Sequence, residues 1–249
     1  MPVDSLTLSL LPAFFAGALL YASVGHGGAS AYLAIMALAG LAPAEMKPVA
    51  LLLNIVVASI GTYKYVRAGC FDARLLGWFA LFSLPMAYLG GSLILPDAWF
   101  KPAVGVVLLF AAWRMVSPAL ARVDAQAKRA PLGGIALSGG AMGLMSGLTG
   151  VGGGIFLSPL VLLMGWASTR ATSGVAAAFI LLNSIAGLAG HLSHAALPLP
   201  SVNLTAWALA VAAGGWIGAE IGSRRIAPFW IRRVLALVLV IAGTKLALI

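Results

Sequence analysis

Long runs of apolar residues, interrupted at short intervals by glycine, proline or charged residues, make up most of this sequence. Ten such runs can be followed along the 249 residues. A helix needs about 20 residues to span about 30 Å of hydrocarbon, and most of the runs approach or exceed that length. The pattern therefore predicts an all-α polytopic membrane protein. The runs cover roughly residues 6–24, 29–41, 48–66, 74–95, 100–117, 132–149, 154–166, 171–192, 201–223 and 230–248.

Two of the runs are too short to cross a membrane comfortably. Residues 29–41 and 154–166 each follow a cluster of glycines. We therefore expect each of them to be part of a broken or re-entrant helix pair. The first run, 6–24, follows Asp4 and lacks the basic segment of a signal peptide, so we treat it as a retained membrane segment.

Composition supports a membrane environment and limits the partners. The chain is 62% hydrophobic and 8% charged, whereas about a quarter of a soluble domain is charged. Such a surface needs lipid around it. The net charge of +9 would suggest a nucleic acid partner in a soluble protein, but the basic residues lie at the ends of apolar runs, where they determine topology. Cys70, the single cysteine, gives neither a disulfide nor a cysteine metal site. We expect membrane lipid as a partner, no nucleic acid, no metal site and no cofactor.

The distribution of basic residues predicts the orientation. Assigning loops alternately to the two sides places twelve of the fifteen basic residues on one side, and the positive-inside rule makes that side cytoplasmic. Both termini are then periplasmic, and the localisation is the cell inner membrane. The cytoplasmic group is Lys64, Arg67, Arg74, Arg114, Arg122, Lys128, Arg129, Arg170, Arg224, Arg225, Arg232 and Arg233, and the other group is Lys47, Lys101 and Lys245.

The two halves of the chain resemble each other across a polar segment. We interpret residues 1–117 and 132–249 as repeats, and 118–131 as a cytoplasmic linker within one integral membrane domain. Five runs per half is an odd number, so the second repeat would enter the membrane from the opposite face. Inverted repeats with interrupted helices are typical of secondary transporters, which bind substrate near the midplane. The matches pair Gly25-His26-Gly27-Gly28 with Gly150-Val151-Gly152-Gly153 at an offset of 125, Asn54 with Asn183 at 129, and Gly91-Ser92 with Gly222-Ser223 at 131.

The paired glycine clusters are the main candidate binding site. Glycine lets backbone N–H groups converge in conformations closed to other residues, and the N-terminus of the following short helix adds about half a positive charge. Together these features can bind an anion without a cationic side chain. Isolated clusters of this kind more often serve turns or close helix packing, but two clusters at matching positions favour binding. The candidates are Gly25, His26, Gly27, Gly28, Gly150, Gly152, Gly153 and Gly154.

Three polar residues in apolar surroundings remain open to two interpretations. Asn54 and Asn183 lie inside apolar runs, where an unsatisfied amide costs several kcal/mol. Each can contact substrate or hydrogen-bond between helices. His26, which has no counterpart in the second cluster, can carry a proton or donate to an anion, or can be a polar residue wetted by a cavity.

Other polar and small residues have simpler interpretations. Glu220 precedes Arg224 by four residues, which predicts an ion pair on one helix. Glycines that repeat every four residues predict close helix packing. These are Gly139, Gly143 and Gly147 in one run and Gly214, Gly218 and Gly222 in another.

The chain resembles the sulfite exporter TauE/SafE family over essentially its whole length. The resemblance rests on the paired glycine loops, on Ala171-Thr172-Ser173 followed by Leu181-Leu182-Asn183-Ser184-Ile185-Ala186-Gly187, and on the linker at the midpoint. The first repeat departs from the family pattern at His26 and at Lys47-Pro48.

The resemblance implies a secondary transporter, not an enzyme, that exports or exchanges small sulfur-containing or carboxylate anions, such as sulfite, sulfonates or other organosulfur compounds, across the inner membrane. The inverted repeats favour alternating access as its mechanism. The sequence leaves open a monomer or a homodimer. An anion channel and an intramembrane serine protease are the alternatives. For the protease, Ser146 with His191 or His194 would be the reacting pair, although the residues around Ser146 do not resemble a nucleophile motif.

Overall fold

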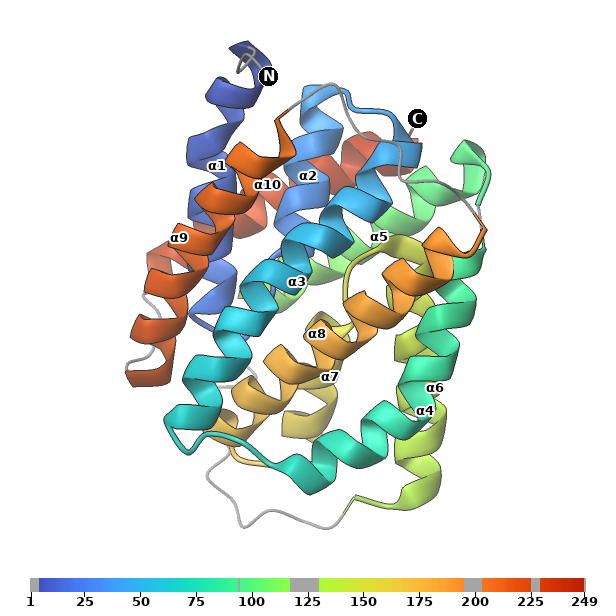
Figure 1. The fold of residues 1–249 in the computed structure, drawn as a ribbon, viewed down its shortest axis with the longest axis vertical. Coiled ribbons are helices and arrows are strands. Elements are labelled where there is room, and N and C mark those ends of the chain that lie inside the picture. The colour runs from blue at the N-terminus through green and yellow to red at the C-terminus, as the bar shows by residue number, and fades with distance from the viewer. Residues whose placement is uncertain (1–4, 94, 117–129, 195–202, 225–228, 249) are drawn as a thin grey trace.

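The computed structural model describes residues 5–93, 95–116, 130–194, 203–224 and 229–248, and all regular elements within these ranges are α-helices (Figure 1). Each helix coincides with one of the ten predicted apolar runs, which confirms the all-α architecture. Residues 117–129, which hold most of the predicted linker, lie outside the described ranges. The helices are α1 (Ser5–Ala22), α2 (Ala29–Ala39), α3 (Pro43–Arg67), α4 (Ala73–Ser92), α5 (Asp97–Val116), α6 (Leu132–Thr149), α7 (Gly154–Leu163), α8 (Thr169–Leu192), α9 (Leu204–Arg224) and α10 (Phe229–Leu248).

The outer surface of the helix assembly is suited to lipid. Within the described ranges, five helices are long and apolar enough to cross a membrane: α3, α4, α6, α8 and α9. Large apolar side chains point outward, and those of Leu137, Val106 and Leu209 are each more than 60% exposed. Contiguous apolar surface of this kind is rare on soluble monomers. The protein is therefore a polytopic membrane protein.

The two short helices turn back along the helices that precede them. α2 has 11 residues and α7 has 10, which corresponds to about 16 and 15 Å, half the hydrocarbon thickness. The rings of Phe14 on α1 and Tyr32 on α2 lie 5.7 Å apart. A Cβ on Gly134, near the start of α6, would lie 3.6 Å from the ring of Trp166, just after α7. Each pair is thus a hairpin whose tip is a glycine loop.

Small residues bring helices from the two halves into backbone contact. A Cβ on Gly214, Gly218 or Gly222 of α9 would collide with a carbonyl oxygen of the α1 segment or the residue after it. A Cβ on Gly143 or Gly147 of α6 would collide in the same way with α4. The predicted packing role of these glycine stripes is confirmed. The contacts between helices are also similar in the two halves, whose helices correspond in order (α1 to α6, through α5 to α10). α1 packs on α9, and α6 packs on α4, which are the corresponding helices. α3 packs on its own counterpart α8, and α5 packs on its own counterpart α10.

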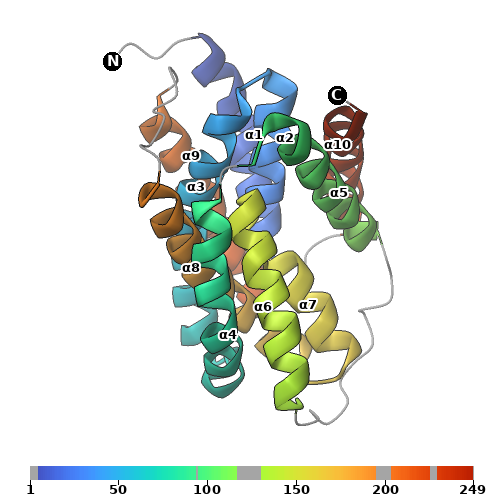
Figure 2. The same cartoon turned by 90° about the vertical axis from the view of Figure 1, so that its right-hand side faces the viewer.

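The directions of corresponding helices differ in space. In Figure 1, α1 starts at the top and runs downward, whereas the yellow-green start of α6 lies at the bottom. α3 runs from the upper right to the lower left, and α8 runs beside it in the opposite direction. Figure 2 shows the same opposition of α1 and α6 from the side. As a consequence, the tips of the two hairpins both point toward the middle of the molecule, where α3 and α8 pack together.

Candidate functional site

The first glycine loop, residues 23–28, joins α1 to α2 through a tight turn. Gly25 and Gly28 have φ angles of +78° and +101°, a region that side chains with a Cβ rarely adopt. The N–H of His26 donates to the carbonyl of Tyr21 at 2.9 Å. The hydroxyl of Tyr32 donates to the carbonyl of Gly27 at 2.8 Å. These bonds hold the loop in one conformation and position the start of α2.

The second loop, residues 150–153, has a similar backbone. Gly150, Gly152 and Gly153 have φ angles of +79°, +81° and +76°. The N–H of Gly150 donates to the carbonyl of Ser146 at 2.9 Å, so the loop begins as the C-cap of α6. Gly153 then becomes the N-cap of α7. Positive φ thus recurs at two matching positions, Gly25 with Gly150 and Gly28 with Gly153, whereas Gly152 has a positive φ and Gly27 does not.

Asn54 on α3 joins the two loops. Its Oδ1 accepts a hydrogen bond from the N–H of Ala29, the first residue of α2, at 3.1 Å. Its Nδ2 donates to the carbonyl of Val151 in the second loop and to the hydroxyl of Ser184, both at 3.3 Å. The side chain is fully buried. The side-chain amide of Asn54 therefore links the first glycine loop with the start of α2, the second glycine loop, and α8.

The contact between the asparagine and the loops is close. A Cβ on Gly27 would collide with Oδ1 of Asn54, and a Cβ on Gly152 would collide with Nδ2. Both of these hypothetical Cβ atoms would also lie 2.9 Å from Cγ2 of Ile180. Glycine is required here because the loop backbones lie directly against the side chains of α3 and α8.

The junction lies near the middle of the membrane-spanning helix that carries it. Asn54 is the twelfth of the 25 residues of α3, so about 16 Å of helix precedes it and about 20 Å follows. This depth matches the midplane position at which transporters of inverted-repeat architecture bind substrate.

Two helix N-termini converge on this junction. The N-caps of α2 and α7 are Gly28 and Gly153, and neither provides a side-chain cap. The first N–H groups of a helix have no partner within the helix, and together with the aligned peptide dipoles they carry about half a positive charge. Oδ1 of Asn54 caps α2 by accepting the hydrogen bond from the N–H of Ala29. The junction is consequently an electropositive environment made of backbone, buried between α3 and α8.

The first glycine of each loop contacts the opposite half of the protein. A Cβ on Gly25 would lie 2.7 Å from Cα of Ser173 at the start of α8. A Cβ on Gly150 would lie 3.0 Å from the carbonyl oxygen of Lys47 at the start of α3. Gly154, in contrast, packs against Ile180 of its own half. Each hairpin tip is therefore held by the long central helix of the other half.

These contacts correct the predicted pairing of the two asparagines. Gly27 and Gly152 both contact Asn54 and Ile180, so Ile180 is the structural counterpart of Asn54, at an offset of 126. The offset of 129 that pairs Asn54 with Asn183 is wrong. Nδ2 of Asn183 donates to the carbonyl of Phe179 on its own helix at 2.8 Å, and its buried Oδ1 has no partner among the described residues. The structure brings Asn54, and not Asn183, into hydrogen-bond contact with the loops.

His26 connects the first loop to α7. Its Nδ1 lies 3.1 Å from the carbonyl oxygen of Val24, and its Nε2 lies 3.4 Å from the hydroxyl of Ser158. With the proton on Nδ1, Ser158 donates to Nε2. The ring is partly exposed and stands edge-on to Tyr21 at 6.3 Å. His26 thus links the first loop to α7 beside the junction.

Several contacts could not be read from local sequence. Ser184 follows Asn183 in the sequence, yet it is the serine that completes the Asn54 cluster. Glu220 forms an ion pair with Lys64 of α3, whereas the side chain of Arg224, its predicted partner, lies outside the described residues. Lys64 also lies 3.8 Å from the ring centroid of Trp216. The hydroxyl of Ser146 and both ring nitrogens of His191 have no hydrogen-bond partner within the described ranges, so these two residues form no Ser–His pair.

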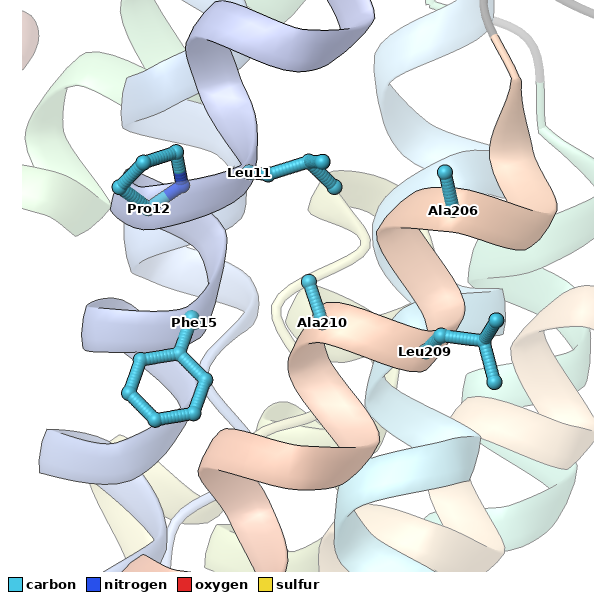
Figure 3. Close-up of a pocket in the computed structure, with 6 residues that line it drawn as sticks. All are labelled: Leu11, Pro12, Phe15, Ala206, Leu209 and Ala210. Carbon is cyan, nitrogen blue, oxygen red and sulfur yellow. The ribbon is translucent and has the colours of Figure 1, made fainter. Parts of the chain in front are cut away.

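A separate groove opens between α1 and α9, away from the glycine loops. Figure 3 shows its six lining residues. Its volume is about 510 Å³ and its lining is apolar, with Leu209 strongly exposed. Because it offers no group that binds charge, it contributes nothing to an anion site. The lining residues are Leu11, Pro12, Phe15, Ala206, Leu209 and Ala210.

Comparison with known proteins agrees with this architecture. A "Probable membrane transporter protein y4hK" of Sinorhizobium fredii (strain NBRC 101917 / NGR234) is 41% identical to this chain over 250 residues, and the match covers 98% of this chain and 99% of the relative. No solved structure matches the chain significantly. The profile of the family described as "Sulfite exporter TauE/SafE" matches residues 10–246. This polytopic protein, with its paired glycine-tipped hairpins, therefore belongs to the sulfite exporter TauE/SafE family of membrane transporters.

Proposed function

We propose that the protein carries a small anion across the bacterial inner membrane by alternating access, with the anion bound between the two glycine loops at Asn54. The observation that carries the proposal is the junction itself. Two loops from opposite halves of the chain meet on one buried amide at mid-depth. Transporters with broken helices bind their substrates at such positions.

The chemistry of the junction favours an anion. The groups that meet there are helix N-termini, the carbonyl of Val151, the amide of Asn54, the hydroxyl of Ser184 and the apolar side chain of Ile180. The helix N-termini supply partial positive charge, and the amide and hydroxyl can donate hydrogen bonds. A compact oxyanion fits these donors. Sulfite, small sulfonates and carboxylates are the substrates that we propose, and the description of the family names sulfite.

Close packing at the junction favours alternating access over an open pore. The loop backbones lie against Asn54 and Ile180 so closely that an added Cβ would collide. An anion can enter only if a hairpin moves away from α3 and α8. We propose that the two halves are inverted repeats, supported by the opposite directions of α1 and α6, and that one hairpin opens to each side of the membrane.

The membrane potential can drive export without a second ion. An anion that leaves a cytoplasm at negative potential gains about 2.3 kcal/mol per charge for each 100 mV. The junction contacts described above include no carboxylate that could carry a coupling proton. We therefore propose a potential-driven uniporter, with both termini in the periplasm as the distribution of basic residues predicts.

Flux from proteoliposomes tests this function. Purified protein in vesicles loaded with sulfite should release it in a saturable manner, faster when a potassium diffusion potential makes the interior negative. Vesicles without protein are the control. Single-channel currents would point to a pore. If sulfite, methanesulfonate and acetate all failed to move, the proposed function would be wrong.

A further inference from the structure

A buried lysine near the start of α3 caps the end of α4. Nζ of Lys47 donates to the carbonyl oxygens of Gly90 at 3.3 Å, Gly91 at 2.8 Å and Leu93 at 3.1 Å. The side chain is 6% exposed. The carbonyls at a helix C-terminus carry about half a negative charge, so they compensate the ammonium only in part.

The charge of Lys47 has no carboxylate partner within the described ranges. The ion pair that the structure shows within these ranges joins two other residues, Lys64 and Glu220. A lysine inside the membrane region is costly. A buried lysine without a carboxylate partner in these ranges can serve a role beyond helix capping.

A buried histidine follows the residue of α8 that packs against this end of α4. Gly190 on α8 packs against this end, because a Cβ there would collide with the carbonyl of Tyr88 and lie 3.0 Å from the N–H nitrogen of Ser92. His191 is the next residue and is 7% exposed. Both of its ring nitrogens lack a hydrogen-bond partner in the described part of the chain. A buried polar group without a partner is unfavourable, and a ligand that bonds to the ring would remove that cost.

Lys47 also adjoins the second glycine loop. A Cβ on Gly150 would lie 3.0 Å from the carbonyl oxygen of Lys47 and 3.4 Å from its Cγ. Asn54 follows two turns later on the same helix, about 10 Å along its axis. Lys47 and His191 therefore lie between the junction at Asn54 and the end of the molecule where α4 terminates.

We propose that Lys47 and His191 form a second anion subsite, through which the substrate passes between Asn54 and that end of the protein. This inference rests on the proposed transport function and adds a cationic residue to it. Nζ of Lys47 exchanges its bonds to the α4 carbonyls for the oxygens of the anion, and the N–H of His191 donates to the same anion. The ligand class is a small oxyanion, such as sulfite, a sulfonate or a carboxylate.

Arg170 provides a matched control. It lies at the start of α8 and donates to the carbonyl of Ser223 at the end of α9, at 3.4 Å, so it contacts the end of α9 much as Lys47 contacts the end of α4. Unlike Lys47, it is exposed. Removing its charge removes a helix cap without touching the proposed subsite.

The test is the affinity of purified protein for radiolabelled sulfite and for methanesulfonate. Lys47→Gln keeps a donor for the α4 carbonyls but removes the charge, and it should weaken binding about tenfold or more. His191→Leu should weaken binding about threefold to tenfold. Arg170→Gln should bind within about twofold of the wild type, since exposed charges contribute little.

The outcomes separate this inference from the proposed function. Wild-type affinity in folded Lys47→Gln and His191→Leu proteins would overturn the subsite while leaving transport at Asn54 intact. An equal loss in Lys47→Gln and Arg170→Gln would show that both residues act only as helix caps, which also overturns it. If Lys47→Gln does not fold, the result for His191→Leu decides. A wild-type protein that binds neither anion would overturn the proposed function itself.

Discussion

Replacing Asn54 by leucine tests whether this residue holds the two loops together. The substitution keeps the branched shape at Cγ but removes three hydrogen bonds, from Ala29 and to Val151 and Ser184. Hydrogen bonds between segments of a membrane protein are worth about 0.6 kcal/mol each on average. The three together predict a loss of about 2 kcal/mol in the free energy of unfolding. Crowding of a methyl group against Gly27 would add to that loss.

The same substitution at Asn183 is the matched control. Both asparagines are fully buried in the centre of a long helix. Asn183→Leu removes one bond to a carbonyl on its own helix, and it also removes an Oδ1 that has no partner among the described residues. Eliminating an unsatisfied buried acceptor offsets the lost bond, so we expect a change of less than about 0.5 kcal/mol, or a slight stabilisation.

Denaturation in mixed micelles with increasing sodium dodecyl sulfate measures both variants in the apo state. Asn54→Leu should unfold at clearly lower detergent fraction than Asn183→Leu. Equal destabilisation of the two variants, or a larger effect at Asn183, would refute the assignment of Asn54 as the residue that joins the loops.

Three further predictions concern the loops, an ion pair and the topology. Gly152→Ala should destabilise the apo protein more than Gly165→Ala in the same unfolding assay. Both residues have positive φ, which costs an alanine about 1–2 kcal/mol, but only at Gly152 would the added Cβ meet a buried amide. Equal losses of stability in the two variants would contradict this. A double-mutant cycle between Lys64 and Glu220, whose side chains are 14% and 33% exposed, should give a coupling energy below about 1 kcal/mol. That energy should decrease as the salt concentration rises, and a coupling energy insensitive to salt would contradict a partly solvated pair. In an otherwise cysteine-free chain, Gln126→Cys should resist an impermeant thiol reagent in intact spheroplasts, and labelling there would place the linker outside.

Much of the architecture followed from the sequence because hydrocarbon allows few backbone solutions. A run of apolar residues in a membrane becomes a helix, since its backbone groups must bond internally. The short lengths of 29–41 and 154–166 predicted interrupted helices, and the structure shows α2 and α7 as the second arms of hairpins. The glycine clusters predicted loops with positive φ, which both loops contain.

The details of the site depended on tertiary contacts that periodicity cannot supply. Asn183 is the only asparagine near the expected position in the second half, and it lies just three residues beyond the counterpart of Asn54. That counterpart, Ile180, is chemically unlike an asparagine. Comparing the sequences of the two halves therefore cannot show that Asn54 and Ile180 correspond at an offset of 126. Lys64 and Glu220 are 156 residues apart, whereas the predicted partner Arg224 was the nearest basic residue along the helix. Lys47 was visible only as a charge beside an apolar run.

The central claim is that the glycine loops and Asn54 bind the transported anion, and equilibrium binding of radiolabelled sulfite to purified protein tests it most directly. Gly27→Ala places a methyl group against Oδ1 and Cγ of Asn54 and against Ile180, where it would block the approach of an anion to the loop. The account predicts saturable binding by the wild type and at least about tenfold weaker binding by folded Gly27→Ala. Wild-type affinity in folded Gly27→Ala would contradict the account, because the loops would then only pack helices and the anion would bind elsewhere.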